Sequence, residues 1–229
     1  MMREPRTYSE LRQQWLQRIV RDGDQLLADR AAQAEALRPA FRASMECLQQ
    51  LLRDPDRDRE DVVAALRLFG AGEALVQRED IPALIELART AREVRGPGSQ
   101  YVEQDVLRAL VQVADEETLP FLIECFRYSR PRDGSAGYRR PIVLRGITAI
   151  AMLSRNEEAL DILDQALTHR LWRVRLAACR AIREVRGLSQ RGLPPRLQQR
   201  LRHIAQREQA RGIRVCAELA LEEAGRGRT

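Results

Sequence analysis

Apolar residues recur along most of this chain at the spacing of one helical face. The clearest case is the stretch 171–182, where Val174, Ala178, Ala181 and Ile182 occupy offsets of 0, 4, 7 and 8 residues. These offsets lie on one side of a helix with about 3.6 residues per turn. The two alanines allow a neighbouring helix to approach closely. The stretch therefore predicts a helix that packs tightly against another helix.

The same stripe occurs four times after residue 100, which indicates a repeated structural unit. Its four positions are Val102, Val106, Ala109, Leu110; then Ile142, Gly146, Ala149, Ile150; then Val174, Ala178, Ala181, Ile182; then Ile213, Ala217, Ala220, Leu221. The first positions of the stripes lie 40, 32 and 39 residues apart. We expect helices centred near residues 107, 147, 179 and 218, each the second helix of a repeat.

A different helix precedes each of these second helices. Ile81 and Leu119 each follow a residue of the capping type, Asp80 or Thr118, and each is followed by a first-turn proline. Ala159 and Leu193 occupy looser matches to the same start. The four positions are separated by 38, 40 and 34 residues. Helix pairs of this length bury both faces only when neighbouring pairs stack.

The N-terminal part shows helical patterns without the repeat. Thr7 and Glu10 have the spacing of a capping box. We expect helices over 8–36, 39–53 and 59–70; Asp54-Pro55-Asp56 ends the second, because a residue preceding proline avoids the helical region. The predicted organisation is a helical cap at 1–57 and a repeat array at 58–229, joined as one continuous domain.

The second-helix pattern Val-Arg-x-x-Ala-x-x-Ala-Leu, with a proline-started first helix, resembles HEAT repeats. The residues that match best are Val174 to Ile182, and the resemblance covers about 80–224 well and 38–79 weakly. It implies an all-α, right-handed α-solenoid of stacked antiparallel helix pairs, with the second helices lining a concave face. It also implies that Arg175 and Arg214 hydrogen-bond between adjacent repeats. Glu103 and Val143 depart from the pattern at that position.

Charge is distributed unevenly and is unusual in kind. All 39 basic residues are arginine, and aromatic residues make up only 4% of the chain. A GC-rich genome is one explanation for the absence of lysine, and selection for bidentate or stacked guanidinium contacts is the other. Residues 171–229 hold 14 Arg and 5 Glu, a net charge of +9, whereas residues 1–170 hold 25 Arg and 28 acidic residues, a net charge of −3. The positive field therefore belongs to the C-terminal quarter.

Aromatic residues and arginines gather where the chain enters the second helices. Helix N-termini, guanidinium groups and aromatic faces all favour anions, so we expect one edge of the array to bind an anionic partner. The candidate residues are Tyr101, Tyr138, Arg139, Arg140, Arg170, Trp172, Arg173, Arg211 and Arg214. The alternative is that the aromatic residues cover the ends of the repeats and the arginines are solvated.

Signals for catalysis, metal or cofactor binding are weak. His169 and His203 are the only histidines and have no metal-ligand spacing, and no phosphate-binding or nucleophile motif occurs. Asp161 and Asp164 share a helical side, which is more typical of a solvated surface than of an acid–base pair. Cys47, Cys125, Cys179 and Cys216 form no C-x-x-C pair, and we expect all four to be buried structural thiols. We therefore predict no catalytic residue, no metal site and no cofactor.

These observations favour a non-enzymatic scaffold that binds a partner protein with an acidic face. A DNA- or RNA-binding solenoid that uses the basic C-terminal repeats is the alternative. An enzyme resembling HEAT-like DNA glycosylases or bilin lyases is a more remote third. No stretch of 18 consecutive apolar residues and no apolar leader occurs, so we expect a cytoplasmic protein that does not bind membranes.

Overall fold

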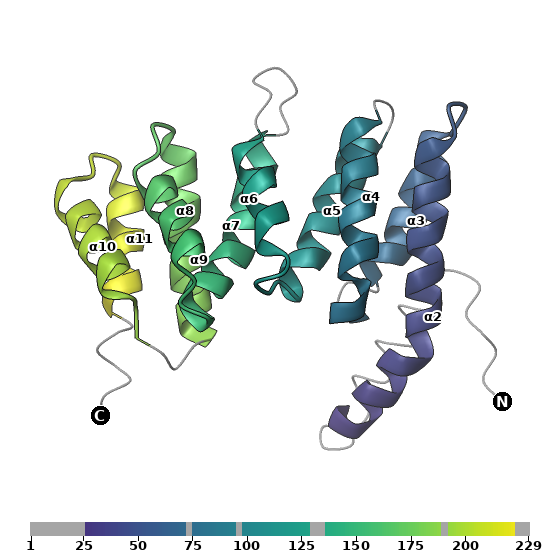
Figure 1. Cartoon of the computed structure of the whole chain (residues 1–229), viewed down its shortest axis with the longest axis horizontal. Helices are drawn as coiled ribbons and strands as arrows, with labels where there is room; N and C mark the ends of the chain where they lie inside the picture. The colour runs from purple at the N-terminus through teal and green to yellow at the C-terminus, as the bar shows by residue number, and fades with distance from the viewer. Residues whose placement is uncertain (1–25, 72–74, 95–97, 129–135, 189–191, 223–229) are drawn as a thin grey trace. The chain divides into compact units, whose positions relative to one another are not determined.

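A computed structural model of the chain describes residues 26–71, 75–94, 98–128, 136–188 and 192–222. These residues form ten α-helices and one 3-10 helix and contain no strand, which confirms the all-α prediction (Figure 1). None of the described helices combines the length and the apolar character that crossing a membrane requires. The chain divides into two compact units, Met1–Ala109 and Leu110–Thr229. The predicted division into a cap at 1–57 and an array at 58–229 stays a prediction.

The described residues of the first unit form a long helix and three shorter ones. Its helices are α2 (Leu26–Arg53), α3 (Arg59–Ala71), α4 (Ile81–Glu93) and most of α5 (Ser99–Gln112), with a 3-10 turn η2 (Arg78–Asp80) before α4. α2 packs against both α3 and α4. Phe41 from α2 and Phe69 from α3 lie in its core with ring centroids 5.2 Å apart. The core is thus formed where the apolar faces of the helices meet.

The predicted separation between the helices 8–36 and 39–53 is wrong. α2 continues through Pro39 from Leu26 to Arg53, because a proline removes only one backbone hydrogen bond and a packed helix can absorb that loss. Phe41, Met45, Leu48 and Leu52 follow it on one buried face. The Thr7–Glu10 capping box and the start of the predicted 8–36 helix lie outside the described residues.

The predicted helix starts at Ile81 and Leu119 are confirmed, but the residues before them do not cap in the expected way. Asp80 and Thr118 both have helical backbone angles and no side-chain bond to the helix that follows. Instead, the Asp80 carboxylate accepts a hydrogen bond of 3.0 Å from the Gln77 N–H. Thr118 donates to the Asp115 carbonyl at 2.7 Å. Each residue therefore stabilises the preceding turn.

The second unit contains three consecutive helix pairs in its described residues. They are α6 (Leu119–Arg127) with α7 (Ala136–Leu153), α8 (Glu157–Leu167) with α9 (Trp172–Leu188), and α10 (Pro195–Arg207) with α11 (Arg211–Glu222). α9 lies between α7 and α11 and packs against both, and α8 packs against α10. The second helices of neighbouring pairs are thus in contact in chain order (Figure 1).

The apolar stripe is the buried face of α5, α9 and α11. Val102, Val106, Ala109 and Leu110 are fully buried in α5; Val174, Ala178, Ala181 and Ile182 in α9, and Ile213, Ala217 and Ala220 in α11, are at most 5% exposed. Only Leu221 is half-buried. The alanines in these stripes are all buried, as the helical phase of the stripe predicted.

The predicted stripe of α7 is confirmed at Gly146 and Ile150, which are buried, and wrong at its other two positions. Ile142 and Ala149 are half-buried, whereas Val143, Ile147, Ile150 and Ala151 form the buried face. This helix is apolar on most sides, so its periodicity does not define a single face. Gly146 lies next to the buried face, and a Cβ atom there would lie 2.9 Å from Leu122 Cδ1 and 3.1 Å from Val111 Cγ1. The side chains of α6 and the end of α5 therefore approach the α7 backbone directly.

Three of the four cysteines are buried, and the expectation for the fourth is wrong. Cys125, Cys179 and Cys216 lie in the core, but Cys47 is exposed. Cys47 comes two residues after Met45 and one before Leu48, both buried, which turns it to the opposite side of α2. Burial raises the pKa of the Cys179 thiol to about 12. Cys179 is therefore a neutral core residue.

Candidate binding surface

The start of α9 exposes an apolar pair at the surface of the second unit. Leu171 and Trp172 are 49% and 52% exposed. Trp172 is the first residue of α9, and the guanidinium carbon of Arg173 lies 5.5 Å from the centre of its ring. Single exposed apolar residues are ordinary, but two adjacent ones form a small apolar patch.

Arg170 and Arg173 flank this apolar pair in the sequence, and Arg211 lies at the start of α11; all three lie where helix dipoles disfavour cations. Arg170, Arg173 and Arg211 are exposed at or just before the first turns of α9 and α11. Neither first turn contains an acidic residue, whereas α8 begins with Glu157 and Glu158. A cation near a helix N-terminus costs stability because the helix dipole is positive there. This edge is therefore electropositive for two reasons, its side chains and its helix ends.

These three arginines carry charge that nothing in the described chain neutralises. No acidic side chain among the described residues pairs with Arg170, Arg173 or Arg211. We call Arg170, Leu171, Trp172, Arg173 and Arg211 the binding edge. It combines an exposed apolar centre with unpaired guanidinium groups.

Elsewhere in the second unit, arginines are used in ion pairs between helices. Arg196 lies 2.5 Å from Asp161, and Arg200 lies 2.7 Å from Asp164, which joins α10 to α8. The hydrogen bond from Arg200 holds the pKa of Asp164 below its ordinary value. Arg145 of α7 donates to Glu184 of α9 with its Nε at 2.9 Å. The +9 charge of residues 171–229 is therefore partly neutralised by ion pairs, whereas Arg173 and Arg211 have no acidic partner in the described chain.

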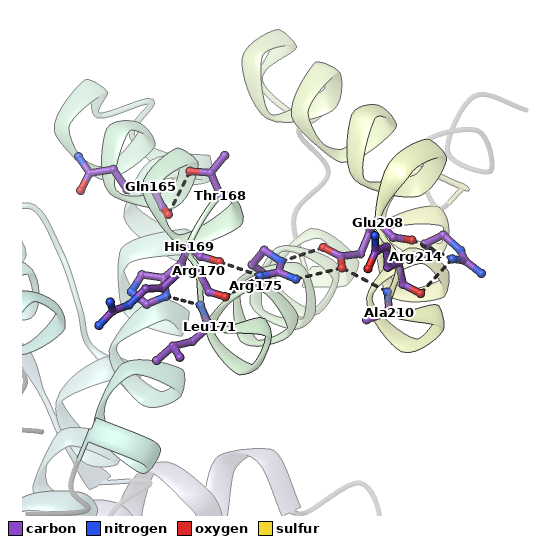
Figure 2. Close-up of polar contacts among 10 residues, drawn as sticks. Gln165, Thr168, His169, Arg170, Leu171, Arg175, Glu208, Ala210 and Arg214 are labelled. Carbon is purple, nitrogen blue, oxygen red and sulfur yellow. Dashed lines mark hydrogen bonds and ion pairs between the residues drawn. The ribbon is translucent and has the colours of Figure 1, made fainter. Parts of the chain in front are cut away.

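Arg175 links two successive loops, as the HEAT-like pattern implied (Figure 2). Its Nη1 donates to the carbonyls of His169 and Arg170 at 2.8 and 3.1 Å. Its Nε and Nη2 donate to the Glu208 carboxylate at 2.8 and 3.0 Å. These hydrogen bonds hold the pKa of Glu208 below its ordinary value. The loop before α9 is thus fixed to the loop before α11.

Arg214 repeats the first half of this arrangement. Its Nη1 donates to the carbonyls of Glu208 and Gln209 at 2.8 and 3.2 Å. The second helices α5 and α7 have other residues at the position that Arg175 and Arg214 occupy. Glu103 of α5 pairs with Arg92 of α4 at 3.2 Å, and Val143 is buried.

Arg139 and Arg140 are buried rather than presented on a surface. Arg140 Nε donates to the Phe126 carbonyl at 3.0 Å, and Arg139 Nη1 donates to the Tyr128 carbonyl at 3.3 Å. They thereby satisfy carbonyl groups at and just beyond the end of α6, which the helix itself leaves without partners. Burial, followed by the charges of Arg170 and Arg139, lowers the pKa of Arg140. Both residues therefore serve the fold at this position.

The binding edge as defined includes neither of the two predicted tyrosines. Tyr101 is 42% exposed in the first turn of α5, in the first unit. Tyr138 belongs to α7, but its side chain lies outside the described part of the structure. Leu171 and Glu208 were missed by the sequence reasoning. The adjacent pair Leu171-Trp172 at a loop was the available signal for the first, and no local signal identifies the second.

The described residues contain no group of His, Cys, Asp and Glu side chains that could hold a metal ion. A pocket of about 240 Å³ lies between α8 and α10, lined by Asp164, Arg196, Gln199, Arg200 and His203. Both of its arginines are paired with aspartates, so its polar groups hold the helices together. Near α9, His169 Nδ1 accepts a hydrogen bond of 3.1 Å from the Leu171 N–H. Burial, with the charges of Arg140, Arg170 and Arg175, lowers the pKa of His169.

A scan against protein-family models finds no match to this sequence, and searches of curated proteins and of solved structures also find none.

Proposed function

We propose that this protein is a non-enzymatic, cytoplasmic scaffold of the HEAT-repeat type that binds a partner protein through the binding edge. The observation that carries the proposal is the exposed pair Leu171 and Trp172, flanked by Arg170 and Arg173, which have no acidic partners in the described chain. Tryptophan and arginine are the residues that most often dominate protein–protein binding energy. The partner surface that complements this edge is apolar at its centre and acidic around it.

The packing of the second unit supports a solenoid of the HEAT type. α7, α9 and α11 are in contact in series, and successive pairs recur at a period near that of HEAT repeats. The bidentate contact between Arg175 and Glu208 joins one pair to the next. In a right-handed solenoid, such a series presents the loops before the second helices along one edge. The binding edge lies in two of these loops and the helix starts that follow them.

Nucleic acid is the second candidate, and the unpaired arginines favour it. Arg170, Arg173 and Arg211 suit phosphate groups, and Trp172 suits a stacked base. A phosphate backbone, however, does not need the exposed Leu171 beside the tryptophan. The proposal for a protein partner accounts for both apolar residues.

A displayed library of random peptides, screened against the full chain, tests the proposal. We expect the enriched peptides to carry acidic residues beside large apolar ones, and to lose binding to the variant Trp172→Ser. Tyr101→Ser is the matched control, because Tyr101 is an exposed aromatic residue in the other unit. Peptides that bind the Trp172→Ser variant as tightly as the wild type would exclude the binding edge as the site. Binding of labelled duplex DNA without peptide enrichment would favour the nucleic-acid candidate.

A further inference from the structure

Arg175 shows how this fold binds a carboxylate between repeats. One end of its guanidinium group, Nη1, is held by the carbonyls of the residues six and five positions earlier, His169 and Arg170. This fixes the plane of the group, so that Nε and Nη2 face the next loop as a fork. The fork donates two hydrogen bonds of 2.8 and 3.0 Å to the Glu208 carboxylate. Bidentate pairs of this kind are the strongest and most directional arginine contacts.

Arg214 has the same anchoring. Its Nη1 binds the carbonyls of the residues six and five positions earlier, Glu208 and Gln209. Figure 2 shows its guanidinium group on the far side of Glu208 from Arg175, with Nη1 turned towards the two carbonyls. Within the described chain, no carboxylate occupies its Nε and Nη2. Arg214 therefore lacks, within the described chain, the carboxylate that Glu208 supplies to Arg175.

The surface beside Arg214 is also uncovered compared with its counterpart. Arg175 is followed by Leu176, which is half-buried, whereas Arg214 is followed by Val215, which is 42% exposed. α11 thus presents an arginine fork at the position that α9 uses to contact the following pair, with an exposed apolar side chain next to it. A segment that places a carboxylate next to an apolar side chain complements both.

We propose that Arg214 and Val215 form a second docking point, at which a glutamate or aspartate of the acidic partner protein binds the vacant fork of Arg214. This inference rests on the proposed function, since it assigns a specific contact to that partner. The occupant is a carboxylate because the identical fork of Arg175 already binds one. Glu208, whose carbonyl anchors Arg214, and the exposed Glu218 further along α11 disfavour the several charges of a phosphate backbone.

The test follows the side-chain Nε–H signals of arginine by NMR in the full chain. The probe is a synthetic hexapeptide, acetyl-Glu-Leu-Glu-Glu-Leu-Glu-amide. We expect a saturable shift of the Arg214 signal, while the signal of Arg202, an exposed arginine of α10, stays unchanged. An unchanged Arg214 signal at peptide concentrations that saturate binding elsewhere would overturn the inference. So would a response of Arg214 to a single-stranded oligonucleotide and not to the peptide.

Substitutions provide a second readout with the same peptide. Arg214→Lys keeps the charge but removes the fork, so we expect binding to weaken about three- to tenfold. Arg202→Lys is the matched control and leaves affinity within about twofold. Equal affinities of the two variants contradict the inference, and the NMR shift decides the case in which Arg214→Lys is poorly folded. Loss of peptide binding in Trp172→Ser, with none in Arg214→Lys, leaves the proposed function standing and removes this docking point.

Discussion

At the residue scale, a few positions decide how closely helices approach. Gly146 and Ala178 are both buried on second helices of the second unit. The sequence identified both as small residues in a stripe, but only the structure shows that Gly146 lies against Leu122 and Val111 while α7 turns Val143 into the core. The sequence pattern could not show whether Ile142 or Val143 begins the buried face of α7, because both residues are apolar.

Two glycine substitutions in the second unit should have opposite effects. Gly146→Ala should destabilise the fold by about 1–3 kcal/mol, because the new Cβ meets three side chains in a packed core. Gly212→Ala adds a Cβ with nothing within 4 Å and should be neutral to about 1 kcal/mol stabilising, since glycine lowers helix propensity. Urea denaturation of both variants measures the difference. A Gly146→Ala protein at least as stable as the wild type would contradict the packing described for α7.

A second pair of substitutions tests the helical phase of α9. Ala178 is fully buried and Arg180 is exposed. Ala178→Leu should cost about 1–3 kcal/mol through overpacking, whereas Arg180→Ala should change stability by less than about 0.5 kcal/mol. Thermal midpoints of the two proteins provide the comparison. Equal losses would mean that the stripe does not face a neighbouring helix.

At the element scale, helices begin and end according to backbone requirements that single residues only partly reveal. The first-turn prolines and the starts at Ile81 and Leu119 were predictable from the sequence, because proline suits the first turn. The continuity of α2 was not, because the tertiary packing after Pro39 outweighs a local preference. The burial of Arg139 and Arg140 was also not predictable from the sequence, since it depends on carbonyl groups at the end of α6.

Replacing the proline inside α2 should stabilise the first unit. Pro39 is exposed, so Pro39→Ala restores a backbone hydrogen bond without opening a cavity. We expect a gain of up to about 3 kcal/mol. Pro82→Ala, in the first turn of α4, is the matched control and should bring no gain, because a first-turn N–H has no helical partner. Differential scanning calorimetry distinguishes them, and a loss of stability in Pro39→Ala would show that α2 depends on a kink at this residue.

The contact between the loops before α9 and α11 should depend on pH. The pKa of Glu208 is lowered from its ordinary value of 4.5, chiefly by the hydrogen bond from Arg175. A carboxylate whose pKa is lower in the folded state stabilises the fold above its unfolded pKa and loses this contribution as the pH falls through the folded value. Glu208→Gln should therefore be less stable than the wild type at about pH 7, and the difference should shrink below about pH 4.5.

Urea midpoints at several pH values measure this difference. Glu218→Gln is the control, because Glu218 is an exposed glutamate of α11 without an arginine partner in the described chain. A gap between Glu208→Gln and the wild type that stays constant down to about pH 3 would show that the Arg175 contact contributes nothing through its charge.

At the scale of the whole molecule, total charge is a poor guide to where an anion binds. The sequence located the positive field in the C-terminal quarter and singled out Arg170, Trp172, Arg173 and Arg211, all of which are exposed. It could not show that Arg196 and Arg200 are neutralised by Asp161 and Asp164 from the preceding helix pair, because these partners are about 35 residues apart. Contacts at that separation depend on the packing of the repeats.

Salt dependence separates the two candidate partners. Arg170, Arg173 and Arg211 replaced together by glutamine should weaken any binding of labelled duplex DNA. The slope of log affinity against log salt should fall by about 0.9 for each phosphate group that the variant no longer neutralises. A triple variant of Arg196, Arg200 and Arg155 is unsuitable as a control because those residues hold helices together, so Arg180, Arg183 and Arg202 serve instead. Identical slopes for the two triple variants would place nucleic-acid binding away from the binding edge.

The ion pairs that join helices in this chain all use guanidinium groups, and this has a chemical consequence. Enzymes that acetylate or ubiquitinate proteins act mainly on lysine amines, and these 229 residues contain none. Contacts such as Arg175 with Glu208 therefore cannot be switched by lysine acetylation. The same absence makes amine-reactive cross-linkers a poor choice for capturing the partner. The exposed Cys47, and carboxylate-directed reagents, provide the practical alternatives for covalent labelling.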